Sequence, residues 1–237
     1  MSTLETDLIQ ASTGTNTAIK IKGKGTGVVK IGDGELSFPD ADGSANQIIK
    51  TNGSGTLSFI DQPSGGAWTL IGTAVASDSA SVTITGLDST YDTFAVAVSD
   101  LIPATDGTHL QMRVGDSSGV DSGSTDYSNH TQMVNASSTS YNATATAGNN
   151  QINLGFYVGN VSGEGFGGLY YIHNPGDGSV VPLITGTSVY KTNGGVTEGG
   201  SMCATRDAVI TLDRVQFIMS SGNITSGRVT AWGIKHA

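Results

Sequence analysis

Short runs of β-branched, aromatic and aliphatic residues recur along most of this 237-residue chain, and Gly, Ser, Asn and Asp separate them. The first kind of residue favours extended strands, and the second favours tight turns. In the longer, C-terminal part the runs fall at residues 68–71, 81–85, 93–98, 110–114, 132–134, 151–158, 168–173, 180–186, 208–212, 215–219 and 228–234. Many short strands at this spacing are typical of an antiparallel β-sandwich, so we expect an all-β protein.

The composition agrees with this prediction and excludes several classes of function. The chain has 34 Gly and only 13% charged residues, which suits strands joined by tight turns better than helices. Its formal net charge of −9 argues against binding to nucleic acid or to an anionic membrane, since neutralising phosphates takes clustered Lys and Arg. Because Cys203 is the only cysteine, no disulfide can form within one chain.

The start of the chain does not resemble a targeting signal. Glu5 and Asp7 stand where a secretory signal would have basic residues and then an apolar run. No stretch of the sequence reaches membrane-spanning length either. We therefore expect synthesis in the cytoplasm without a signal peptide, and no insertion into a membrane.

Residues 1–17 are mostly polar and predict an extended arm, with a short helical turn over residues 4–10 as the alternative. The apolar residues in this arm are Leu4, Leu8 and Ile9. From Ala18 onward apolar and basic residues alternate, which indicates a half-buried strand whose lysines protect its edge. This alternation sets the start of an N-terminal module, residues 18–61.

The N-terminal module contains a short internal repeat. Residues 28–38 and 48–59 each hold an aliphatic pair, a lysine, a Gly-rich turn and a closing Leu-Ser-Phe. Each copy predicts a β-hairpin, and a hairpin of this size cannot bury its own apolar face. We therefore expect the module to pack against other copies of the chain, as a homotrimer. The candidate packing residues are Val29, Ile31, Leu36, Phe38, Ile48, Leu57 and Phe59.

Residues 62–66 are the candidate linker to the β-sandwich, residues 67–237, because Pro63 interrupts strand pairing and two glycines follow it. The end of the sandwich is expected to be a hairpin, in which the runs 215–219 and 228–234 flank a turn over residues 220–227 and the second run closes the sheet. Phe217 and Trp232 should then be buried. Residues 235–237 should lie at a surface or at a subunit seam.

Two segments of the sandwich, residues 115–129 and 136–150, are dense in Ser, Thr, Asp, Asn and Gly and predict long exposed loops. Tyr127, His130 and Tyr141 lie in or beside them and are candidates for contacts with a glycan or a protein. The alternative is that both segments are plain solvated connections, as most loops of this kind are.

Two motif matches lack the structural context that their chemistry needs. Gly115-Asp-Ser-Ser-Gly119 has the letters of a nucleophile elbow, but loop-like residues follow Ser117 instead of a helix. Gly163-Glu-Gly-Phe-Gly-Gly168 has the letters of a dinucleotide-binding loop, but a strand-like run follows it. We therefore assign neither a catalytic residue nor a cofactor site to these motifs.

The potential metal ligands are too far apart in sequence to predict a site. The histidines are separated by twenty or more residues, and no pair has metal-ligand spacing. Asp116, Asp121 and Asp126 lack the alternating oxygen ligands and the glycine of a calcium loop. Glu164 and Glu198 are likewise too isolated to nominate as the acid and base of a polysaccharide-degrading enzyme. The sequence predicts no catalytic, cofactor-binding or metal-binding residue, and no enzyme activity.

Three segments resemble proteins of tailed-bacteriophage virions. The segment from Gly43 to Phe59 is similar to one that lies between an N-terminal β module and a distal domain in phage fibres and virion surface proteins. The segment from Tyr91 to Val114 resembles the core of a jelly-roll-like domain of such proteins, and so does the segment from Phe217 to Gly227. The resemblance implies a homotrimer with an N-terminal attachment part and a C-terminal jelly-roll-like knob, on the surface of a virion assembled in the host cytoplasm.

Two roles are compatible with this resemblance. A capsid decoration, or cement, protein would lay its N-terminal part on capsid proteins and project the knob outward. A receptor-binding tail fibre would join tail proteins and use the knob loops to bind a host receptor, a glycan or a protein. The chain is short and lacks shaft repeats and coiled-coil heptads, which favours the first role. The candidate docking residues are Leu4, Leu8, Ile9, Ile19, Lys20, Ile21, Lys22 and Lys24.

Overall fold

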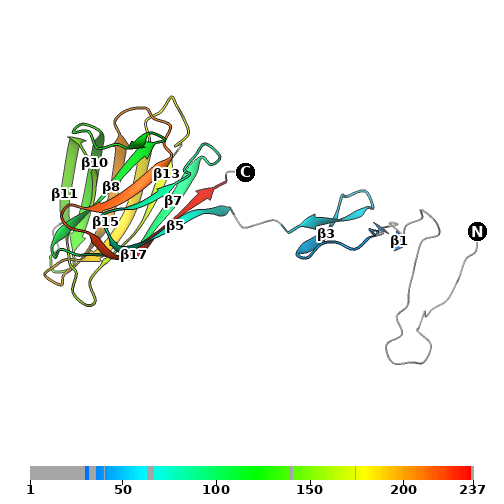
Figure 1. Cartoon of the computed structure of the whole chain (residues 1–237), viewed down its shortest axis with the longest axis horizontal. Helices are drawn as coiled ribbons and strands as arrows, with labels where there is room; N and C mark the ends of the chain where they lie inside the picture. Colours follow the sequence, from blue (N-terminus) through cyan, green and yellow to red (C-terminus); the bar gives the residue numbers. More distant parts are fainter. Residues whose placement is uncertain are drawn as a thin grey trace, which may run out of the picture. The chain divides into compact units, whose positions relative to one another are not determined.

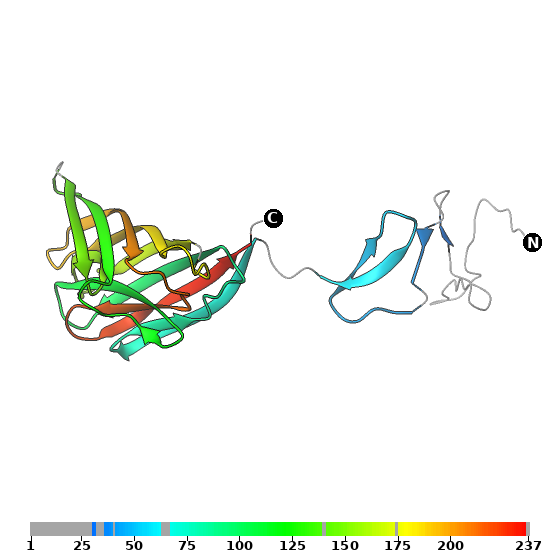
Figure 2. The same cartoon turned by 90° about the horizontal axis from the view of Figure 1, so that it is seen from above.

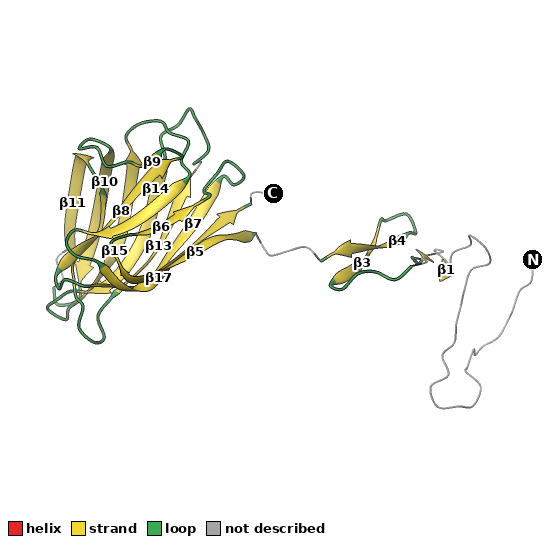
Figure 3. Cartoon of the chain, in the orientation of Figure 1, coloured by secondary structure: helices red, strands yellow, loops and turns green. Residues whose placement is uncertain are grey.

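The computed structural model describes residues 30–31, 36–39, 41–62, 67–138, 141–173 and 175–235, with the backbone alone described at 30–31 and 141–142. Every regular element in these residues is a β-strand, which confirms the predicted all-β class (Figure 3). No helix in the described ranges has the length and apolarity to cross a membrane. The chain divides into two compact units, Met1–Ser64 and Gly65–Ala237.

The first unit contains small antiparallel hairpins. Strand β1 (Lys30–Ile31) pairs with β2 (Leu36–Ser37), and β3 (Gln47–Thr51) pairs with β4 (Leu57–Asp61) (Figure 1). The turn between β3 and β4 is closed by Asn52, whose side-chain oxygen accepts hydrogen bonds from the backbone N–H groups of Ser54 and Thr56 at 2.8 and 3.1 Å. The predicted N-terminal hairpin is therefore confirmed.

The second unit consists of two antiparallel sheets (Figure 2). The eight-stranded sheet has the order β11 (Tyr141–Asn149), β10 (Tyr127–Asn135), β15 (Thr197–Arg206), β14 (Leu183–Lys191), β13 (Phe166–His173), β7 (Thr93–Pro103), β17 (Ile224–Ile234) and β5 (Trp68–Ser79). The five-stranded sheet has the order β12 (Ile152–Val158), β8 (Thr108–Asp116), β16 (Arg214–Met219) and β6 (Val82–Thr85), with β9 (Gly119–Val120) beside β8.

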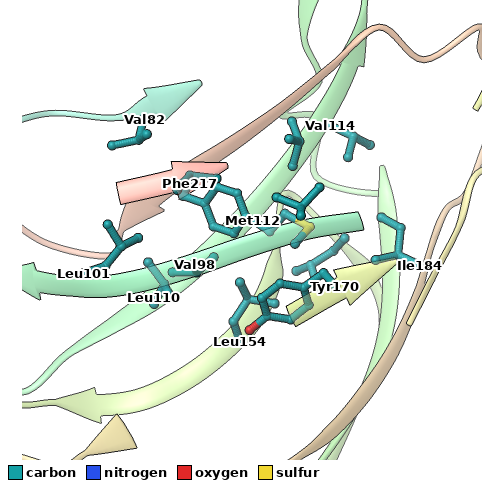
Figure 4. Packing of buried hydrophobic residues seen from close by; sticks show 14 of the residues in the cluster. Val82, Val98, Leu101, Leu110, Met112, Val114, Leu154, Tyr170, Ile184 and Phe217 are labelled. Carbon is teal, nitrogen blue, oxygen red and sulfur yellow. The ribbon is translucent and has the colours of Figure 1, made fainter. Parts of the chain in front are cut away.

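The core lies between the two sheets, as expected for a β-sandwich. Along β16, Val215, Phe217 and Met219 are buried while the residues between them are partly exposed, which is the period of two that a half-buried strand requires. Phe217 meets Tyr170 of the opposite sheet with ring centroids 6.3 Å apart, and Figure 4 shows both rings among aliphatic side chains. Burial of such alternating residues from both sheets holds the sandwich together.

A glycine makes room for one of these core rings. Tyr170 on β13 is the register partner of Gly186 on β14, and its ring lies over the glycine. A Cβ atom at position 186 would collide with this ring and would stand 2.8 Å from the carbonyl oxygen of Leu169. Because the backbone oxygen cannot move aside without disturbing the ladder, only glycine fits at this position.

Replacing Gly186 with alanine is therefore expected to lower the free energy of unfolding by about 1–3 kcal/mol through overpacking. Gly178 is the matched control, because a Cβ atom there meets nothing within 4 Å, and its replacement should change stability by less than about 0.5 kcal/mol. Urea unfolding followed by tryptophan fluorescence measures both values. Equal effects at the two positions would contradict the steric explanation.

The predicted C-terminal hairpin is wrong. Strand β16 belongs to the five-stranded sheet and β17 to the eight-stranded sheet, where β17 lies between β7 and β5. The residues between β16 and β17 are hydrogen-bonded to β8 and to the β7–β8 connection. Ser220 donates its N–H to the His109 carbonyl at 2.9 Å, and Ala104 donates its N–H to the Asn223 carbonyl at 2.9 Å. These hydrogen bonds hold the segment in which the chain crosses from the five-stranded to the eight-stranded sheet. Lys235 is exposed, and residues 236–237 lie outside the described residues.

The two predicted loops are also corrected by the structure. Most of residues 136–150 form β11, and residues 115–129 contain the β8–β9 turn and the start of β10. Strands β9, β11 and β15 were not predicted, whereas the predicted strand at residues 208–212 is an irregular segment. Strand β11 is rich in Ala and Thr, whose small side chains gave no apolar run, yet its ladder with β10 pairs it firmly into the sheet.

Candidate functional site

One face of the eight-stranded sheet, here called the outer face, is turned away from the core. Tyr170, Ile184, Met202 and Ala204 point inward and are buried, so the residues that alternate with them point outward. The strand register aligns these outward residues into rows across the sheet. One row runs from β5 to β11 through Leu70, Trp232, Ala95, Tyr171, Thr185, Cys203, His130 and Ala145.

Aromatic side chains gather at one side of the outer face. The ring of Trp68 lies 6.0 Å from that of Trp232 and 6.4 Å from that of Tyr171, and Tyr171 stacks on His173 with centroids 6.5 Å apart. Ala95 is fully buried although it points outward, because Trp232 and Tyr171 flank it in register. Trp232 therefore belongs to the outer face, where it is half-buried, and the prediction that it lies in the core is wrong. Phe217 is fully buried, as predicted.

Next to these rings the outer face has an open hollow of about 680 Å³. Its lining includes His130, His173, Leu183, Thr185 and Cys203. The Nε2 atom of His173 lies 3.2 Å from the Thr185 hydroxyl, and Cys203 is an exposed free thiol. With methyl, hydroxyl and imidazole groups in its wall and no carboxylate, the hollow suits an uncharged surface better than a charged ligand.

A second hollow, of about 290 Å³, lies where β12 approaches the ends of β10, β11 and β15. Its lining residues are Met133, Ala143, Thr144, Phe156, Tyr157 and Glu198. The carboxylate of Glu198 is held at both oxygens: Oε2 accepts a hydrogen bond from the Tyr190 hydroxyl at 2.7 Å, and Oε1 accepts one from the Asn135 amide at 2.7 Å. Burial raises the pKa of Tyr190, so its hydroxyl remains a donor to Glu198 at neutral pH.

Tyr157 is the most unusual residue of this second hollow. Its φ of 56° lies in the left-handed region, which costs on the order of 1–3 kcal/mol for a bulky residue, and its side chain is 59% exposed. The backbone is held in place by Asn193, which donates its N–H to the Tyr157 carbonyl at 2.8 Å. His109 packs against the ring at 5.1 Å, and burial lowers the pKa of this histidine. A fixed, exposed ring beside an oriented carboxylate can bind a ligand that has one apolar face and hydroxyl groups at its edge.

Of the predicted knob-loop contacts, Tyr127 is excluded because its side chain is fully buried at the start of β10. Its hydroxyl accepts a hydrogen bond from the Val114 N–H at 2.9 Å and can donate to the carbonyl of Val114 or Asp121, each at 2.9 Å. His130 lies within β10 and faces the first hollow, so it is accessible from the outer face instead of from a loop. Tyr141 belongs to β11, where its backbone pairs with Val134.

The candidate packing residues of the N-terminal module differ in exposure. Leu36 and Ile48 are 39% and 42% exposed, whereas Phe38, Leu57 and Phe59 are half-buried. Ile31 belongs to β1. The remaining candidate, Val29, lies outside the described residues, as do the arm and the docking candidates Leu4, Leu8, Ile9, Ile19, Lys20, Ile21, Lys22 and Lys24. Ile49, which was not nominated, is 49% exposed on the opposite face of β3 from Ile48.

The two rejected motifs lie in β-structure. Ser117 is exposed in the turn between β8 and β9, where Asp116 accepts a hydrogen bond from the Ser118 N–H at 2.8 Å. Residues 163–168 lead into β13, a strand. Within the described part of the chain, no three His, Cys, Asp or Glu residues come together as ligands for a metal ion.

The residues that sequence reasoning missed are Tyr157, Glu198 and Tyr171. Glu198 was set aside as isolated in sequence, and the fold brings it to Tyr157 from a different strand and a different sheet. The alternation in Leu169-Tyr-Tyr-Ile-His173 does indicate that one of its two tyrosines faces outward, but not which one. Comparisons with protein-family models, with curated proteins and with solved structures find no match to this chain.

Proposed function

We propose that the protein is a non-enzymatic structural protein on the surface of a tailed-phage virion. In this proposal it is a homotrimeric capsid decoration protein that docks on capsid proteins through its N-terminal part. Its β-sandwich is a jelly-roll-like knob that projects from the particle. A protein that binds only the assembled shell stabilises that shell by mass action.

The observation that carries the proposal is the exposure of apolar side chains on both faces of the β3–β4 hairpin. Ile48 and Ile49 are neighbours on β3, point to opposite faces and are 42% and 49% exposed. An isolated two-stranded hairpin is marginally stable in water, so apolar groups on both of its faces favour a partner on each side. Copies of the same module in a trimer would supply one partner, and a capsid surface would supply the other.

The test is to locate the protein on particles that carry an epitope-tagged copy, using gold-labelled antibody and electron microscopy. Label over the head is the expected result. Label at the tail tip would support the fibre alternative, and purified particles without the protein would overturn both roles. Deleting residues 1–24 from the tagged copy should abolish its incorporation, because this segment holds the docking candidates.

The second hollow favours the alternative function, a receptor-binding tail fibre that recognises a host surface glycan. Its volume of about 290 Å³ is enough for a single sugar ring, and Tyr157 offers a flat apolar surface for that ring. Glu198 and Thr144 could accept hydrogen bonds from sugar hydroxyls at the edge of the ring. Aromatic and polar groups in one concave place are the usual components of a small-molecule site.

If this alternative holds, replacing Tyr157 with alanine should weaken glycan binding by about tenfold to a hundredfold, since the stacking surface is lost. Val161 is the matched control, because it is exposed to the same 59% and is not part of the hollow. A glycan array probed with the full-length protein, followed by titration of any hit, measures the effect. Binding that survives in Tyr157→Ala and fails in Val161→Ala would place the glycan elsewhere.

A further inference from the structure

We propose that copies of this chain associate through the outer face of the eight-stranded sheet. The proposal names the surface of the self-association inferred above and rests on that part of the proposed function. The trimer was inferred from the N-terminal hairpins and from the resemblance to phage virion proteins, and neither points to this surface. Three features of the outer face support the proposal: its charge, its apolar side chains and its extent.

The outer face lacks carboxylates in a domain that is rich in them. Residues 67–237 carry thirteen acidic and six basic side chains. Beside the row through Cys203 lie two further rows that contain no Asp, Glu, Lys or Arg. They are Trp68, Ile234, Thr93, His173, Leu183, Thr205 and Ser128, and then Thr73, Thr230, Ala97, Leu169, Thr187, Ser201, Gln132 and Ala143.

The next row has one basic residue, Arg228, beside Val75 and Ser99. The acidic groups close to these rows include Asp207, which follows β15, and Asp100, which lies within β7. Asp207 accepts hydrogen bonds from the hydroxyls of Ser128 and Thr205, each at 2.6 Å, and Asp100 stands at an irregularity in β7. Carboxylates therefore border the outer face without entering it.

Large apolar side chains on the outer face are exposed in the single chain. Leu70 is 60% exposed, Val75 69%, Val134 54% and Val189 55%. They stand on β5, β10 and β14, so they are spread across the sheet instead of forming a local cluster. A partner that covers the outer face would bury these four side chains together.

The extent of the face matches a stable protein interface. Eight strands about 4.8 Å apart, crossed by the four rows described above at about 6.8 Å spacing, give an area on the order of 1,000 Å². A standard interface buries about 800 Å² on each partner. The first hollow, around Cys203, would be covered by such an interface.

The charge distribution favours a second copy of this chain over an unrelated partner. Two copies with a net charge of −9 repel each other wherever their carboxylates approach, and this face lets them meet without opposing carboxylates. Interfaces between identical subunits are poor in charged groups and more apolar than those of transient partners. The Ser, Thr and Gln side chains of the face carry both donors and acceptors, so different parts of the face can pair with the faces of two neighbouring copies, as a three-fold arrangement requires.

Cys203 provides a direct test, because it is the only cysteine, lies in the middle of the outer face and is exposed in the single chain. In the full-length protein at tens of micromolar, a maleimide should label Cys203 at least about tenfold more slowly than in the variant Thr187→Glu, which puts a carboxylate into the face. The matched control is Thr85→Glu, an exposed strand position on the five-stranded sheet, which should behave like the original protein.

Sedimentation of the same samples separates the outcomes. An oligomer with protected Cys203, lost in Thr187→Glu, is the expected result. A stable oligomer in which Cys203 reacts freely would overturn this interface while the trimer itself stands, held by the N-terminal module. A monomer at every concentration would overturn both. Protection that persists in a dilute monomer would mean that another part of the same chain covers the face, and this too would overturn the proposal.

Discussion

Replacing Phe217 with alanine is expected to lower the free energy of unfolding of the β-sandwich by about 3–5 kcal/mol. Phe217 has no exposed surface and stands on β16, in the five-stranded sheet. Its ring meets that of Tyr170 from the eight-stranded sheet, so the substitution removes contacts that join the two layers (Figure 4). Strand β16 is held between β6 and β8 by its ladders with both, so the backbone cannot collapse into the space that the ring leaves.

Urea unfolding of the full-length protein measures this loss. Phe217→Leu should cost less than about 1.5 kcal/mol, because it keeps most of the buried volume. Ile218→Ala, at the next position of the same strand, is the second control: its side chain points away from the core and is partly exposed, so its loss should be clearly smaller. A change of less than about 1 kcal/mol in Phe217→Ala would mean that the core does not depend on this contact.

Phe217 also illustrates what the sequence could predict. Its strand is a dense run of β-branched and aromatic residues with a period of two, so local propensity and tertiary packing agree. Strand β15 shows the opposite case, since Gly199 and Gly200 interrupt its apolar pattern. A Cβ atom at Gly200 would collide with the Gln132 carbonyl of the neighbouring strand, so glycine is required where these two backbones approach closely. Its partners on β10 and β14 make this segment a strand, and they are remote in sequence.

The partners of a strand also decide which of its side chains reach the protein surface, and the sequence does not show these partners. Trp232 was predicted to be buried as part of a hairpin that closes the sheet, but the sequence of a strand does not say which of its residues face the core. In the structure Ala231 and Gly233 face inward and Trp232 faces outward, next to Trp68. Likewise the outer face becomes visible as a surface poor in charged groups only when the register of eight strands aligns residues from every part of the β-sandwich. No single segment carries that signal.

Tyr127→Phe is expected to cost about 1–3 kcal/mol of stability, although it removes a single oxygen atom. The hydroxyl of Tyr127 is buried, accepts the N–H of Val114 on β8 and donates to a carbonyl of Val114 or Asp121. Phenylalanine would leave the Val114 N–H without this acceptor, away from water, whereas the Val114 carbonyl would keep the N–H of Asp121 as its donor at 2.9 Å. The control is Tyr171→Phe, whose ring is partly exposed on the outer face and whose replacement should change stability by less than about 0.5 kcal/mol.

The pH dependence of stability gives a second measure of the Tyr127 hydroxyl. Burial raises the pKa of Tyr127 from 10.0 to about 12, so the folded state holds the phenol proton more tightly than the unfolded state does. The stability that this difference provides is present in full below pH 10 and is lost as the pH rises from about 10 through 12. Urea unfolding across this range should therefore show a steep loss in the original protein.

Burial also raises the pKa values of Tyr170 and Tyr190, so part of the alkaline loss will remain in the variant. The decisive quantity is the difference between the two slopes, because Tyr127→Phe has already lost the hydroxyl and should fall less steeply above pH 10. Identical slopes would mean that the Tyr127 hydroxyl has the same proton affinity in the folded and unfolded chains. Burial would then not be what sets the pKa of the Tyr127 hydroxyl in the folded protein.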